Sequence, residues 1–264
     1  GAAYQRFSCI KIILKMSERT RYRTIVISDV HLGNRHAKVR EVTDFLSSVD
    51  CDRLILNGDI IDGWQLRKSG DRTWKPEYTE LLKIMMKMME NSGTEIIYVM
   101  GNHDDFLLNV TPFYFSRISI VRDYVLDCGE HRFYVTHGDI FDNVSTKMKW
   151  LAKLGDLGYR ILLFINQEYN RYRLWRGKPY YSLSQAIKQK VKNAVSSMSG
   201  LEVLVGDVAR SHRCDGVICG HIHRPEDRMI GDVRYLNSGD WVESLSCLTE
   251  DFDGNWNIMR YNDR

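Results

Sequence analysis

Five apolar segments of this sequence end in residues that can bind a metal ion or transfer a proton. The run 96–100 is followed by Gly101, Asn102, His103 and Asp104, and the runs that begin near residues 25, 54, 133 and 217 end in a similar way. The candidate functional residues after the five runs are carboxylates, imidazoles and one amide: Asp29, His31, Asp59, Asn102, His103, Asp104, His137, His221 and His223. A single shared site would explain this repeated pattern.

This set of ligand types indicates a particular chemistry. Carboxylate, imidazole and amide groups without a thiolate suit a pair of divalent first-row metal ions better than a structural zinc ion. A two-metal site needs a bridging carboxylate, and Asp59 is central in the set. Two such ions lower the pKa of a bound water and hold the attacking and leaving oxygens of a displacement at phosphorus. The residues therefore predict phosphoester hydrolysis.

His103 has a different predicted role from its neighbour Asn102. Successive side chains of an extended segment point in opposite directions, so we expect His103 to serve the chemistry rather than to bind metal. A protonated imidazole can stabilise charge on the phosphoryl oxygens or protonate the leaving group. We expect Asp104 to lie beside His103, to orient the ring and to raise its pKa.

The apolar runs are typical of strands, and in open α/β sheets a ligand site lies beyond the carboxyl ends of the strands. Helices are expected over 39–49 and, between Pro76 and Gly93, over a dense apolar stretch. Strands are expected at 24–28, 53–56, 96–100, 120–126, 132–136, 216–219, 233–237 and 244–249. The 120–126 and 132–136 segments should form an antiparallel pair. An α/β half followed by antiparallel strands predicts an α/β fold with two sheets packed face to face and helices outside.

The segment from about 143 to 200 has helical spacing and interrupts the strand pattern. It has eleven basic residues and only two acidic residues, Asp156 and Glu168, and aromatic residues are interleaved with the charges. We expect a helical cap in which Arg171, Arg173 and Arg176 bind an anionic, amphiphilic substrate, or which lies on an anionic membrane face. A solvated basic surface is the alternative. Residues 1–22 are expected to be a tail, and 23–264 one domain carrying this insertion.

Composition excludes several other classes of protein. The formal net charge of +3 over 264 residues is too small to argue for a nucleic-acid partner. Six cysteines without a CxxC pair favour reduced thiols over a zinc ribbon or a disulfide framework. The apolar run 9–16 is too short to cross a membrane. We therefore expect a cytoplasmic protein, and the sequence leaves its oligomeric state open.

Five blocks of the sequence resemble the calcineurin-like metallophosphoesterase superfamily. They occur in the expected order at 29–31 (DVH), 58–62 (GDIID), 101–104 (GNHD), 136–139 (THGD) and 220–223 (GHIH). The resemblance implies a four-layer α/β/β/α sandwich with two divalent metal ions; manganese is favoured, and iron and zinc are the alternatives. It also implies the ligand sets: one ion would be bound by Asp29, His31, Asp59 and His223, and the other by Asp59, Asn102, His137 and His221.

Within that superfamily, the helical insertion and the segment 237–243 are similar to the bacterial UDP-2,3-diacylglucosamine diphosphatase group. This similarity implies hydrolysis of a diphosphate bond in a lipid-linked nucleotide of lipid A biosynthesis. It also implies a cap that holds acyl chains. From the basic, aromatic surface of the insertion we expect peripheral contact with the inner face of the membrane. His103 stands where well-known members carry Arg. An Arg can clamp a diphosphate but cannot act as an acid.

Two alternatives to an enzyme that acts on a lipid-linked nucleotide follow from the same residues. The first is a phosphodiesterase or phosphatase that acts on another substrate with the same fold. The second is a non-catalytic scaffold that has kept the fold, for which the expected sign is a degraded set of metal ligands. In this sequence all of the ligand positions are filled.

Overall fold

The structure is a computed structural model that describes residues 19–69, 74–141, 169, 171–177 and 200–263. The chain divides into two compact units: residues up to Asp139 together with those from Val208 form one, and the segment between Ile140 and Asp207 forms the other. The predicted cap therefore lies largely outside the described residues. Every helix among the described residues is too short or too polar to span a bilayer.

A mixed seven-stranded sheet forms the centre of the first unit, in the order β12-β11-β1-β2-β3-β5-β4. Its strands are β1 (Thr20–Ile27), β2 (Val49–Asn57), β3 (Glu95–Val99), β4 (Phe113–Phe115), β5 (Ile118–Val121), β11 (Ser246–Glu250) and β12 (Trp256–Arg260). The strands β1, β2, β3 and β5 run parallel to one another. Their carboxyl ends therefore reach the same edge of the sheet, as a strand-end site requires.

The second sheet has five strands in the order β6-β7-β8-β10-β9. They are β6 (Tyr124–Cys128), β7 (His131–Val135), β8 (Gly216–Cys219), β9 (Glu226–Ile230) and β10 (Val233–Asn237). The expectation of a purely antiparallel second half is wrong, because β7, β8 and β10 are parallel. The charged strand β9, which lacks a clear apolar pattern, pairs antiparallel with β10. It returns the chain so that β10 can run parallel to β8.

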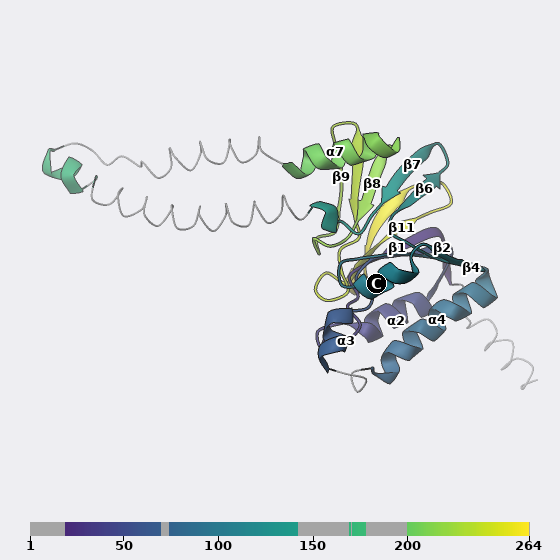
Figure 1. Cartoon of the computed structure of the whole chain (residues 1–264). Helices are drawn as coiled ribbons and strands as arrows, with labels where there is room; N and C mark the ends of the chain where they lie inside the picture. Colours follow the sequence, from purple (N-terminus) through teal and green to yellow (C-terminus); the bar gives the residue numbers. More distant parts are fainter. Residues whose placement is uncertain (1–18, 70–73, 142–168, 170, 178–199, 264) are drawn as a thin grey trace, which may run out of the picture. The chain divides into compact units, whose positions relative to one another are not determined.

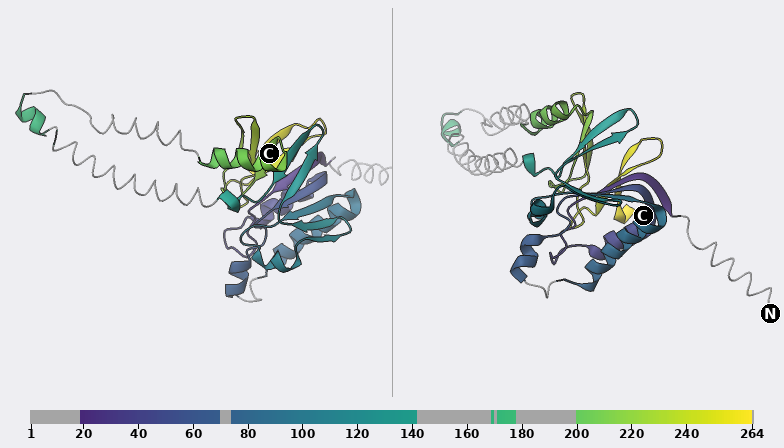
Figure 2. Two further views of the ribbon diagram at one scale, coloured as in Figure 1. Left: turned by 45° about the horizontal axis from the view of Figure 1, so that its top comes forward. Right: turned by 45° about the vertical axis from the view of Figure 1, so that its right-hand side comes forward.

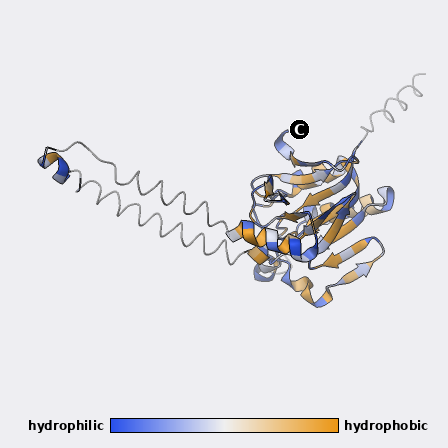
Figure 3. Cartoon of the chain, turned by 90° about the horizontal axis from the view of Figure 1, so that it is seen from above, coloured by the Kyte–Doolittle hydropathy of each residue, from blue (hydrophilic) through white to orange (hydrophobic). Residues whose placement is uncertain are grey.

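The two sheets pack face to face through an apolar core, so the predicted sandwich is confirmed (Figures 1 and 2). Val26, Ile55 and Ile97 from the larger sheet are fully buried in the same cluster as Ile218 and Leu236 from the smaller. In the hydropathy colouring these strands carry many of the apolar residues (Figure 3). Burial of this surface is the main favourable contribution to the stability of the fold.

Helices α2 (Val39–Ser47) and α4 (Pro76–Ser92) cover the other face of the larger sheet (Figure 1). Phe45 of α2 and Leu81 of α4 are fully buried in one cluster with Ile25 and Leu54 of the strands. The helix α4 starts at Pro76 and is capped by Gly93 in the left-handed conformation, with φ of 69°. Both ends were expected from the sequence, because proline suits a first helical turn and glycine a left-handed cap. On the smaller sheet, His212 of α7 (Gly200–His212) stacks on Tyr134 at 3.9 Å between ring centroids.

The predicted strand 120–126 is two strands in two different sheets. β5 ends at Val121 in the larger sheet, and β6 begins at Tyr124 in the smaller one. The exposed pair Arg122 and Asp123 separates them. This polar pair can face solvent where the chain crosses from one sheet to the other. The segments before and after it are both apolar, so in the sequence they look like one continuous strand. The predicted antiparallel pairing holds for β6 with β7.

Candidate metal centre

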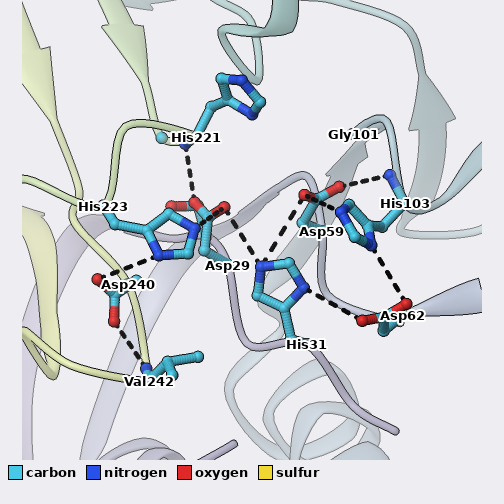
Figure 4. A network of polar contacts seen from close by, with 12 residues as sticks. Asp29, His31, Asp59, Asp62, Gly101, His103, His221, His223, Asp240 and Val242 are labelled. Carbon is cyan, nitrogen blue, oxygen red and sulfur yellow. Dashed lines mark hydrogen bonds and ion pairs between the residues drawn. The ribbon is translucent and has the colours of Figure 1, made fainter. Parts of the chain in front are cut away.

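The strand ends of both sheets bring the predicted ligands together. Three groups of side chains each place one ligand atom per residue within 4.8 Å of one another: Asp29 with His31 and His223; His31 with Asp59 and His103; and Asp59 with His137 and His221. His31 and Asp59 each belong to two of these groups, so the groups form one continuous cluster. Figure 4 shows the first two groups. The first and third groups match the division into two ligand sets that the family resemblance implies.

The backbone at the centre is held in an uncommon conformation. Five of the ligand-type residues have positive φ: Asp29, His31, Asp59, His221 and His223, at 53° to 63°. Left-handed backbone is unfavourable for residues with a Cβ atom and costs of the order of 1–3 kcal/mol at each position. Such conformations persist when the surrounding structure over-determines them. These backbone conformations therefore lower the stability of the fold, and they direct the five side chains into one cluster.

A glycine allows the closest backbone approach in the cluster. A Cβ atom on Gly101 would lie 2.2 Å from Asp59 Oδ1 and 2.5 Å from the Asp59 backbone nitrogen. Those distances are far below van der Waals contact, so any larger residue would displace the Asp59 carboxylate. The glycine of the GNHD block is thus needed because the β3 end packs directly against the β2 end.

A polar group faces the second nitrogen of two of the imidazoles, through a hydrogen bond at His137 and an ion pair at His223. His137 Nδ1 lies 2.9 Å from the carbonyl oxygen of Asn57, which can only accept, so Nδ1 carries the proton and Nε2 faces Asp59 Oδ2 at 3.3 Å. His223 Nε2 lies 3.1 Å from Asp29 Oδ1, and its Nδ1 lies 3.6 Å from Asp240 Oδ2. A partner on the far nitrogen is the usual arrangement for a metal-binding histidine.

The carboxylates of the centre are held in their ionised form. Burial opposes ionisation of Asp59, but the hydrogen bond and the charge of His137 outweigh it and lower the pKa of Asp59 to about 2. Burial likewise opposes ionisation of Asp29, and His223 and His137 lower its pKa below 3.8. Burial also opposes protonation of His137, yet Asp59 and Asp29 raise its pKa to about 10. The two carboxylates thus favour a positive charge beside them, and a metal ion could supply it in place of the proton, because a ligating histidine is neutral.

The residues fit divalent metal ions by a second criterion. Within the part of the chain that the structure describes, the buried side-chain oxygen Oδ1 of Asn102 has no hydrogen-bond partner. A buried amide oxygen without a partner is costly. A cation bound beside Asn102 would satisfy it, which is consistent with the role predicted for this residue.

The structure corrects the predicted pairing of His103 with Asp104. The Asp104 carboxylate accepts hydrogen bonds from the backbone N–H groups of Asp59, Ile61 and Gly101 at 2.6, 3.1 and 3.2 Å, and from the Tyr98 hydroxyl at 2.8 Å. It is fully buried, and burial raises its pKa to about 6. Asp104 therefore anchors the loops that carry Asp59 and Asn102. The chain turns after His103, so the two neighbouring side chains point to different partners.

Asp62 is the carboxylate beside His103, and it was missed as a functional residue. Asp62 Oδ1 lies 3.2 Å from His103 Nδ1, while Asp62 Oδ2 lies 3.8 Å from His31 Nδ1 (Figure 4). His103 Nε2 faces Asp59 Oδ2 at 4.0 Å, so the ring points toward the cluster rather than away from it. Asp62 stands three residues after Asp59 in the 58–62 block, and this second carboxylate of the block was the available signal.

Two further residues support the centre. Asp240 Oδ1 accepts backbone N–H groups from Val242 and Ser244, which fixes the carboxylate that faces His223. Trp64, in helix α3 (Gly63–Ser69), lies against His103 with 4.1 Å between ring centroids. Asp240 stands in the segment 237–243 that the sequence analysis singled out, whereas Trp64 follows the 58–62 block, and residue type alone assigns neither of them to the centre.

Of the predicted substrate-binding residues, Arg171, Arg173 and Arg176 belong to the second unit. Residues 171–175 are helical, and the guanidinium groups of Arg173 and Arg176 each lie 5.7 Å from the ring centroid of a tyrosine four residues earlier, Tyr169 and Tyr172. These contacts are within that unit. Their role in substrate binding stays a prediction.

Comparison with known proteins decides the family. Residues 22–225 match the calcineurin-like phosphoesterase family. The chain belongs to this family. The predicted resemblance is confirmed, and this calcineurin-like phosphoesterase is a hydrolase of phosphate esters whose family implies divalent metal ions.

Curated relatives of this phosphoesterase match over most of their length. A UDP-2,3-diacylglucosamine hydrolase of Aeromonas salmonicida is 27% identical, with 85% of this chain and 88% of the relative covered. A protein of the same name from Aeromonas hydrophila is 25% identical, with 85% and 93% covered. A third, from Hamiltonella defensa, is 22% identical, with 76% and 77% covered.

Proposed function

We propose that this phosphoesterase hydrolyses the diphosphate bond of a lipid-linked nucleotide such as UDP-2,3-diacylglucosamine. The observation that carries the proposal is the match to relatives of that name over most of both chains. The cluster of carboxylates and imidazoles at the strand ends supports it, because its groups could hold cations beside His103, a candidate proton donor. We place the enzyme in the cytoplasm, at the inner face of the membrane where such a substrate resides.

The metal ligands in this proposal are the residues of the cluster. Asp29, His31 and His223 would hold one ion, Asn102, His137 and His221 the other, and Asp59 would bridge them; we favour manganese. When bound, the two ions would lower the pKa of a water and hold the attacking and leaving oxygens. The anionic carboxylates of Asp29 and Asp59 would keep both positions attractive to cations at neutral pH.

His103 would act on the leaving group. Its Nδ1 faces Asp62 at 3.2 Å, and its Nε2 points toward Asp59 at 4.0 Å. Asp62 would hold a proton on Nδ1 and so keep the ring in one orientation. A protonated Nε2 would then donate to the leaving phosphate oxygen. Trp64 covers one side of the ring and limits its rotation.

A wider phosphodiesterase activity is the second candidate, and His103 is the observation that favours it. An arginine at this position would grip a diphosphate through several donors, whereas one imidazole offers a single proton at a time. Such a site would depend less on a second phosphate in the substrate. The two candidates therefore differ in substrate range and share one centre.

A substrate panel with manganese tests the proposal. The panel compares UDP-2,3-diacylglucosamine, UDP-glucose as a nucleotide diphosphate without acyl chains, bis(p-nitrophenyl) phosphate and p-nitrophenyl phosphate. We expect the highest kcat/KM with the acylated substrate. Equal or better cleavage of the small diester would favour the second candidate, and no cleavage of any member would favour a scaffold.

Substitution of the cap arginines should separate binding from chemistry. We expect the triple change Arg171→Glu, Arg173→Glu and Arg176→Glu to raise KM for the acylated substrate by about tenfold or more, because close like charges oppose an anionic ligand. Hydrolysis of bis(p-nitrophenyl) phosphate should change little. Both constants are measured by steady-state kinetics.

The matched control carries the same change of charge elsewhere. Three exposed lysines lie at the start of α4 or on it, on the side of the helix layer that faces away from the larger sheet: Lys75, Lys83 and Lys87. Their replacement by Glu should leave the KM for the acylated substrate and the hydrolysis of bis(p-nitrophenyl) phosphate unchanged. If the arginine variant loses activity on both substrates equally while it stays folded, the segment is a structural part of the enzyme and the cap proposal is wrong.

A further inference from the structure

The outer strand β4 of the larger sheet has the features of a contact surface. Its three residues, Phe113, Tyr114 and Phe115, are 43%, 71% and 68% exposed. It pairs on one side with β5 and ends the described sheet on the other. The chain has no charged residue between Asp105 and Arg117. Exposed aromatic residues on an open, uncharged edge are a hazard for aggregation unless something covers them.

The other edge strands are protected, which makes β4 distinct. Among the described strands the sheets end at β12, β6 and β9 as well as at β4. β12 carries Arg260 and β6 carries Asp127, while β9 carries Glu226, Asp227 and Arg228. Charged side chains on an edge are the usual device against unwanted pairing. This device is absent only from β4 among the four, so pairing at β4 is tolerated or used.

The backbone of β4 decides what kind of partner fits. Every second N–H and C=O group of an edge strand points away from its neighbour. Lipid acyl chains cannot accept or donate hydrogen bonds, and open sheet edges do not occur in hydrocarbon. Another strand can satisfy these groups and cover the aromatic rings at the same time. The edge therefore fits a protein strand better than a lipid surface.

The sequence of β4 is its own complement. In an antiparallel pair centred on Tyr114, Phe113 stands opposite Phe115 of the second copy, and Tyr114 opposite the second copy's Tyr114. Phe113 and Phe115 lie on one face of the strand, with stacked rings 6.5 Å apart between centroids. Directly opposite aromatic pairs stabilise a sheet. A two-fold axis through Tyr114 would place all four phenylalanine rings on one face.

We propose that β4 is a homodimer contact, at which two copies of this chain join their larger sheets by antiparallel pairing of residues 113–115. The strand is short, since Pro112 precedes it and Ser116, with φ of 54°, follows it. A contact of three residues per copy is smaller than a standard stable interface, which buries about 1,600 Å² of surface. We therefore expect a dimer that dissociates on dilution. The inference rests on the edge strand alone and is independent of the substrate.

Sedimentation velocity of the full chain over a range of concentrations tests the proposal. We expect a monomer–dimer equilibrium for the wild type. Phe115→Lys removes two aromatic pairs per dimer and should weaken association by at least about tenfold. Met229→Lys is the control, because Met229 is 59% exposed on the charged edge β9. It should leave association unchanged, and both variants should keep the wild-type circular dichroism spectrum.

A disulfide trap tests the register. In a Cys9→Ser background the remaining native cysteines are buried, and none of them forms a disulfide within the described residues. Tyr114→Cys should form a covalent dimer under mild oxidation, because residues opposite in a sheet lie within the Cα separation that a disulfide needs. Phe113→Cys should form far less, since it faces Phe115 of the second copy. A monomer at every concentration, or a dimer that Phe115→Lys does not weaken and Tyr114→Cys does not trap, would overturn the proposal.

Discussion

Asp59→Asn should reduce phosphoesterase activity to the background rate and lower the bound metal content. Asp59 is the carboxylate that lies between the two halves of the cluster, within 4.0 Å of His31, His103 and His137 nitrogens. The asparagine has the same shape and can still accept the His103 backbone N–H, which lies 2.8 Å from Oδ1. The variant therefore removes the charge and the bridge with little change in packing.

Metal content is measured by elemental analysis and activity with bis(p-nitrophenyl) phosphate. Asp232→Asn is the control, because Asp232 is exposed in the turn between β9 and β10. It should behave as the wild type. Retention of activity by folded Asp59→Asn would contradict a mechanism that depends on a bridging carboxylate.

His103→Gln should lower kcat by about 10² to 10⁴, the usual contribution of a positioned general acid. Glutamine keeps a polar side chain of similar length but cannot carry the proton. The metal content should stay near that of the wild type, because the proposed ligand set does not include His103. The measurement combines single-turnover kinetics with elemental analysis. Loss of metal together with the imidazole would instead make His103 a ligand.

Two asparagine variants distinguish the carboxylates near His103. Asp62→Asn should lower kcat with normal stability, since Asp62 faces the His103 ring at 3.2 Å. Asp104→Asn should lower the free energy of unfolding by about 1–3 kcal/mol, because an amide cannot accept all of the buried donors that now reach Asp104. Chemical denaturation separates the two effects. If Asp104→Asn lowers kcat without loss of stability, Asp104 has a catalytic role after all.

The strand ends were predictable because they obey local rules. An apolar run that stops at a carboxylate or an imidazole marks both the strand and the candidate ligand, and parallel strands deliver their ends to one edge. Asp29, Asp59 and His137 follow this rule. So does α4, whose ends are fixed by Pro76 and Gly93.

The contacts that join these elements were not predictable, because they depend on turns. Asp62, and not Asp104, lies beside His103 because of the path that the chain takes after Asn102. Adjacency in sequence gives no information on that path. The division of 118–128 between two sheets depends on the exposed pair Arg122 and Asp123, which reads like any polar residues within a strand. Sheet membership is a tertiary property that residue patterns alone do not encode.

Anomalous diffraction from crystals grown with manganese tests the central claim most directly. We expect two difference peaks in each chain, both within coordination distance of the Asp59 carboxylate, one beside Asp29 and His223 and the other beside Asn102 and His137. A single peak, or two peaks of which only one lies at Asp59, would contradict a dinuclear centre bridged by this residue.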